Sequence, residues 1–102
     1  MEGNKYYTLE GSFVKNLPEQ KKLEEAIKAH LEYLDIGFKD GSVLVSGPKI
    51  GGGGGIIIVK CEDIDKFCND DPLVKAGIQE YRITEFKLHK CQDFLTDWFK
   101  EI

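Results

Sequence analysis

Apolar side chains recur along the first part of the chain with two different periods. Over residues 6–14 they alternate with polar ones, which predicts a β-strand. Over residues 18–37 they recur every three or four positions, as at Ile27, Leu31 and Leu34, which predicts an amphipathic helix that ends around Gly37 or at the turn of residues 40–41. The chain therefore opens with a strand followed by a long helix.

Shorter apolar runs follow this helix. Residues 43–45 and 56–59 consist only of valine, leucine and isoleucine, which predicts two strands. The turn between them includes five consecutive glycines. Residues 61–69 predict a second helix, and residues 78–88 predict a long last strand.

Three further features lie before, within and after the last predicted strand. Asp71, just before a proline, is the expected N-cap of a short helix over residues 72–76. Within the strand, the apolar parity changes between Ile83 and Phe86, which predicts either a bulge or a strand that buries both faces. The aromatic-rich tail over residues 90–102 predicts a terminal helix.

The predicted order of elements indicates the fold class. Strand, helix, strand, strand, helix, strand is the βαββαβ order of a ferredoxin-like α+β sandwich, here with an added C-terminal helix. The 102 residues fit one domain, residues 1–102, with a core over about residues 6–88. Because helices would cover one sheet face only, the open face predicts association with a second copy.

Composition narrows the classes of function. A net charge of −4, with acids and bases interleaved, argues against nucleic-acid and anionic-membrane binding. No apolar run approaches the roughly 20 residues that span a bilayer. The three cysteines form no Cys-x-x-Cys pair and no metal-ligand spacing, so we expect no metal or other cofactor and a reducing, cytoplasmic location.

His30 is the most informative residue because it lies on the apolar side of the long predicted helix. An imidazole has two nitrogens that need partners and titrates near neutral pH. Burying it where a leucine would pack is costly unless a hydrogen bond compensates. His30 is therefore either a hydrogen-bonded core histidine or the chemical group of a pocket.

Two sequence blocks carry a resemblance to a known family. The first combines His30 in the helix with the turn SGP at residues 46–48. The second is the segment DPLVKAGI at residues 71–78. With both blocks in this order, the chain resembles the YciI-like (YCII-related) family over roughly residues 6–88.

That resemblance implies a dimeric α+β barrel, in which the open sheets of two copies face each other. It also implies a site centred on His30 and Asp71, with Ser46, Gly47 and Pro48 lining the same cavity and binding substrate. Some family members look like dehydrochlorinases or lactone-processing enzymes of aromatic degradation. The chain departs from the family in its short, nearly all-glycine loop, in its C-terminal extension, and in having Ile27 where an arginine often stands.

Two classes of function stay open. As an enzyme, the protein would be a cofactor-independent lyase or isomerase, dehydrochlorinase-like or muconolactone-isomerase-like, with His30 as general acid/base and Asp71 orienting it. As a non-catalytic homodimer, it would bind a small molecule or act as an accessory module, with Asp71 a plain helix cap and His30 a satisfied core residue. The glycine run leads into a strand, which contradicts a phosphate-binding loop and favours a linker or a lid.

Overall fold

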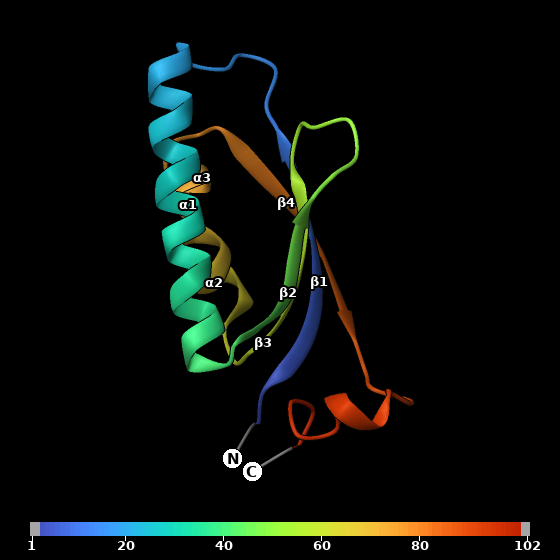
Figure 1. The fold of residues 1–102 in the computed structure, drawn as a ribbon. Helices are drawn as coiled ribbons and strands as arrows, with labels where there is room; N and C mark the ends of the chain where they lie inside the picture. The colour runs from blue at the N-terminus through green and yellow to red at the C-terminus, as the bar shows by residue number, and fades with distance from the viewer. Residues whose placement is uncertain (1–2, 101–102) are drawn as a thin grey trace.

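In a computed structural model, which describes residues 3–100, helices cover one face of a four-stranded antiparallel sheet (Figure 1). The elements are β1 (Lys5–Phe13), α1 (Gln20–Asp40), β2 (Val43–Pro48), β3 (Gly55–Cys61), α2 (Ile64–Asn69), α3 (Pro72–Lys75), β4 (Gln79–Phe86) and a 3-10 turn at Asp93–Leu95. The strand order is β2-β3-β1-β4. The predicted ferredoxin-like α+β fold is confirmed.

The core lies between the sheet and the helices, and every layer contributes to it. Its buried members come from all but one of the strands and from α1 and α2: Tyr7, Leu9, Leu34, Val43, Ile57, Val59 and Cys68. Burying apolar surface of this kind stabilises the fold by roughly 25 cal/mol per Å². No helix within residues 3–100 is long and apolar enough to cross a membrane.

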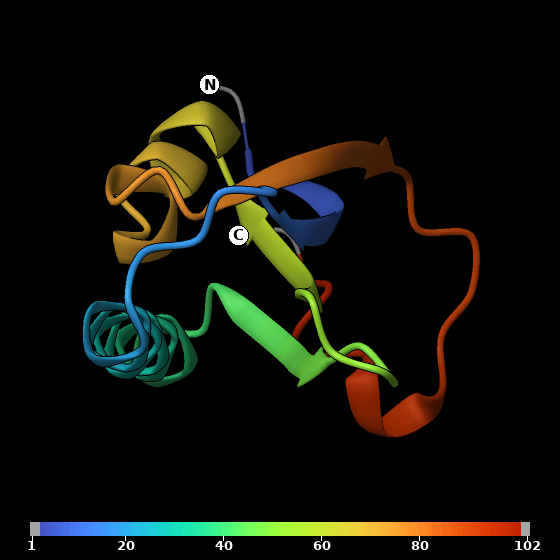
Figure 2. The same cartoon turned by 90° about the horizontal axis from the view of Figure 1, so that it is seen from above.

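The strand register decides which side chains face the helices. Leu9 on β1 lies opposite Ile57 on β3 and Ile83 on β4, and directly opposed residues project to the same face. Leu9 and Ile57 are buried beneath the helices. The intervening residues, such as Thr8, therefore project to the other face, which the helices leave open (Figure 2).

The C-terminal segment covers one end of this open face, on the side of the sheet away from α1 (Figure 2). The Trp98 indole donates its Nε1–H to the carbonyl of Gly41 at 2.8 Å, and Lys60 Nζ lies 4.7 Å from the centre of the indole ring. The Tyr6 hydroxyl donates to the carbonyl of Phe99 at 2.7 Å, and their rings meet edge to face. An aromatic cluster thus ties the chain end to β1 and β3.

The predicted helix over residues 90–102 is wrong for the part of it that the structure describes. Only the 3-10 turn at Asp93–Leu95 forms there, and residues 101 and 102 lie outside the described range. Aspartate, threonine, cysteine and aromatic residues are mediocre helix formers, and a helix this short is marginal without help. Turns bring Trp98 and Phe99 against Tyr6 instead, where their rings pack.

Candidate active site

His30 and Asp71 are in direct contact although 41 positions separate them in the sequence. α1 carries His30 on the side that faces the sheet, and Asp71 is the N-cap of α3. Nδ1 of the imidazole lies 2.9 Å from each carboxylate oxygen of Asp71. The structure therefore brings together the two residues that the sequence singled out: His30 in the long helix and Asp71 just before Pro72.

The partners of Asp71 decide which nitrogen of His30 carries the proton. The carboxylate is completely buried, and it accepts from the backbone N–H of Leu73 at 3.0 Å and from the Tyr81 hydroxyl at 2.5 Å, besides His30. An ionised carboxylate only accepts, so three surrounding donors satisfy it. Nδ1 of the neutral ring must then be the donor, which leaves a lone pair on Nε2.

Tyr81 is a residue of the candidate site that the sequence reasoning missed. Burial, followed by the hydrogen bond to Asp71 and the charge of Asp71, raises its pKa, while the neighbouring Gln79 amide acts in the lowering direction. The phenol consequently stays protonated and keeps donating to the carboxylate. It fixes the Asp71 side chain from the sheet, as the Leu73 amide fixes it from α3.

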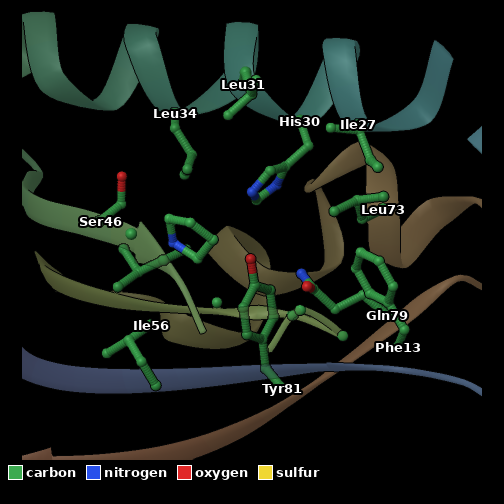
Figure 3. A pocket seen from close by; sticks show the side chains of 17 residues that line it. Phe13, Ile27, His30, Leu31, Leu34, Ser46, Ile56, Leu73, Gln79 and Tyr81 are labelled. Atoms are coloured by element: carbon green, nitrogen blue, oxygen red, sulfur yellow. The ribbon is translucent and has the colours of Figure 1, made fainter. Parts of the chain in front are cut away.

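A cavity of about 530 Å³ lies between α1 and the sheet, and His30 forms part of its wall (Figure 3). Ile27, Leu31 and Leu34 line it from the helix. Because Nδ1 is bonded to Asp71, the nitrogen left to face the cavity is Nε2. The His30 side chain is 14% exposed, so its ring is largely withdrawn from water yet reachable from the cavity.

The turn formed by Ser46, Gly47 and Pro48 lines the same cavity, at the end of β2. Residues 52–55 of the glycine run continue this wall. The N–H of Phe13 donates to the carbonyl of Gly53 at 2.9 Å, which holds the glycine loop against β1. In this structure the loop is a wall of the cavity.

The lysine that opens this loop is also bonded to β1. Lys49 Nζ lies 2.9 Å from a carboxylate oxygen of Glu10 and 2.9 Å from the Ser12 hydroxyl. The hydrogen bond and charge of Lys49 lower the pKa of the Glu10 carboxyl. Side-chain and backbone contacts together therefore hold the loop beside the site.

Neither Cys61 nor Cys68 is an activated nucleophile. All three cysteines are free thiols, and burial raises the pKa of Cys61 to about 11 and that of Cys68 to about 12. Since the thiolate is the nucleophilic form, both thiols are inert at neutral pH. Within residues 3–100, no group of three or more histidine, cysteine or acidic side chains could hold a metal ion.

The sequence of this region matches the model of a known protein family. Residues 7–87 match the model of the YCII-related domain. The chain belongs to the YCII-related family. The matched region of this YCII-related protein contains His30, Asp71 and the cavity walls, whereas the C-terminal aromatic cluster lies largely beyond it. No curated protein matches the chain.

Proposed function

We propose that this YCII-related protein is a cofactor-independent lyase or isomerase in which His30 moves a proton next to a carbonyl group. One observation carries the proposal: a buried carboxylate holds Nδ1 of His30, so that Nε2 faces an apolar cavity as a base. Imidazole is the side chain best suited to proton transfer near neutral pH. A core histidine with a purely structural role would not need a cavity beside it.

The proposed step begins when Nε2 takes a proton from the carbon next to the carbonyl of the substrate. The electron pair moves toward the carbonyl oxygen, and Asp71 stabilises the imidazolium that forms. In an isomerisation, His30 returns this proton to another carbon of the same conjugated system. In an elimination of HX, the halide leaves with its bonding electrons and the proton passes from His30 to solvent.

The open face of the sheet supports the homodimer that this function would use. Val45 and Ile56 project there with 49% and 43% of their surface exposed, and Ile58 lies opposite Val45 on the same face. Apolar side chains grouped on an uncovered sheet suit association with a second copy. The three free thiols support a reducing, cytoplasmic location.

The isomerisation of α-angelica lactone to its conjugated β isomer tests the proposal. This reaction removes a proton beside the carbonyl and returns one at the ring carbon that carries the methyl group. We expect the protein to accelerate it, and His30→Gln to slow the protein-catalysed rate by about a hundredfold or more. Ultraviolet absorbance of the conjugated product follows the rate.

The second histidine provides the matched control. His89 is exposed and outside the cavity, so His89→Gln should leave the rate unchanged. Equal rates for wild-type protein and His30→Gln would contradict the proposal. Binding of the lactone without turnover that depends on His30 would favour the small-molecule-binding module instead.

A further inference from the structure

We propose that the side-chain amide of Gln79 binds the carbonyl oxygen of the ligand, so that the cavity selects small neutral carbonyl compounds with an apolar body. This inference rests on the proposed function, because it names the substrate class of the same cavity. Gln79 begins β4 and lines the cavity together with His30 and Tyr81.

The amide nitrogen of Gln79 is buried, and at least one of its two N–H donors has no partner within the described residues. The residue is 4% exposed, and Nε2 carries two N–H donors. The amide acts on the Tyr81 hydroxyl and partly opposes the rise of its pKa, but that single oxygen could accept at most one of the two donors. Leaving a buried donor unsatisfied costs about 1–3 kcal/mol, which a ligand acceptor would remove.

The neighbouring strand leaves space for this amide. On β1, Gly11 lies beneath it, and a Cβ at position 11 would be 2.6 Å from both Cδ and Oε1 of Gln79. Any side chain there would push the amide away from its present position. Figure 3 shows the amide end of Gln79 pointing into the cavity, in the direction of His30 and Tyr81. The donor is thus aimed at the region where a substrate would meet His30.

The other cavity walls indicate what the acceptor is attached to. No aspartate, glutamate, lysine or arginine is among the lining residues that the structure describes, so a carboxylate would find no fixed opposite charge. The Tyr81 hydroxyl already donates to Asp71. Most of the remaining wall is aliphatic or glycine, and the volume of about 530 Å³ suits a small organic molecule. A neutral ester, lactone or ketone fits these walls better than an anion.

The same hydrogen bond would assist the proposed proton transfer. When His30 removes a proton beside a carbonyl, negative charge develops on the carbonyl oxygen. A donor already directed at that oxygen stabilises the charge without having to reorganise. Gln79 would then both determine ligand specificity and stabilise the negative charge that develops during the reaction.

Acetophenone and ethylbenzene test this inference because they have similar shapes and only acetophenone has a carbonyl. We expect acetophenone to shift the side-chain amide signals of Gln79 in nitrogen–proton NMR spectra, whereas ethylbenzene leaves them nearly unmoved. In Gln79→Met, which keeps the side-chain length, the affinity for acetophenone should fall about tenfold. The affinity for ethylbenzene should be unchanged or higher, since the buried donor has gone.

Gly11→Ala is the second variant, because it displaces the amide while keeping Gln79 itself. It should produce the same selective loss of acetophenone affinity. Equal losses for both ligands, unmoved Gln79 signals with acetophenone, or no binding of either ligand would overturn the inference. A carbonyl-selective response without any His30-dependent lactone isomerisation would leave the role of Gln79 standing and reject only the proposed proton transfer.

Discussion

Replacing Asp71 with alanine should lower the free energy of unfolding by about 4 kcal/mol. The substitution leaves the Nδ1–H of His30, the hydroxyl of Tyr81 and the N–H of Leu73 without their shared acceptor. Removing one member of a buried ionic or hydrogen-bonded set typically costs about 3–5 kcal/mol, and loss of a helix N-cap alone costs about 1 kcal/mol. Urea denaturation of wild-type protein and variant measures the difference.

Asp70→Ala is the matched control at the adjacent position. The Asp70 carboxylate lies 2.7 Å from Lys66 Nζ, but this pair is exposed and spans one helical turn. Such pairs contribute less than about 1 kcal/mol. Similar losses for Asp70→Ala and Asp71→Ala would mean that Asp71 does not organise the site as described.

Gly54→Ala should destabilise the protein by about 3 kcal/mol and deform the cavity wall. Gly54 has φ +142°, a region that other residues rarely adopt, and an added Cβ would lie within 2 Å of the Gly11 carbonyl oxygen. The conformation alone costs about 1–3 kcal/mol for a residue with a side chain. The clash with the backbone of β1 adds to this cost, because the Gly54 carbonyl is held by the N–H of Lys49 at 2.9 Å. Thermal and urea unfolding both report the change.

Gly52→Ala separates the clash from the conformational cost. Gly52 also has positive φ, +84°, but an added Cβ would meet nothing within 4 Å. We expect a loss of about 1 kcal/mol there. If the two alanine variants were equally stable, the close contact between the glycine loop and β1 would not exist in solution.

The order of the elements was predictable because alternation and helical spacing are local signals. Element ends were less predictable. The helix expected from residue 18 begins at Gln20, and of its two expected ends the one at the Asp40-Gly41 turn is found. Cys61 ends β3 instead of opening a helix. Asp63, which accepts from the N–H of Lys66, caps α2 at a later start. Asp71 as the N-cap of α3 is confirmed. Capping chemistry is local, so it could be read before the fold was known.

The changing parity of β4 has an explanation that involves the rest of the molecule. The pairing of β4 with β1 runs without interruption, so this strand has no bulge there. Ile83 projects toward the helices, while Phe86 projects to the open face and meets the Tyr6 ring at 6.0 Å between centroids. Neither predicted alternative is found, because the pairing is regular and Ile83, 39% exposed, is not buried. Trp98 and Phe99 of the C-terminal segment, whose conformation was predicted wrongly, complete the aromatic cluster around Tyr6.

The site was partly visible in the sequence for similar reasons. His30 interrupts an apolar stripe, and Asp71 precedes a proline, so each is conspicuous in its own segment. Gln79 and Tyr81 alternate along a strand like many ordinary residues, and their roles depend on what faces them across the sheet. Tyr81 lies opposite Gly11, and this pairing puts a hydroxyl and an amide beneath α1. Only the register of β4 against β1 reveals that these two side chains belong to the site.

Nitrogen NMR of the His30 ring, at a pH where the ring is neutral, tests the central claim most directly. The contact with Asp71 predicts a proton on Nδ1 and an unprotonated Nε2, and it predicts that Asp71→Ala abolishes this preference. A neutral ring that carries its proton on Nε2 in the wild-type protein, or one whose tautomer is indifferent to Asp71, would contradict the account.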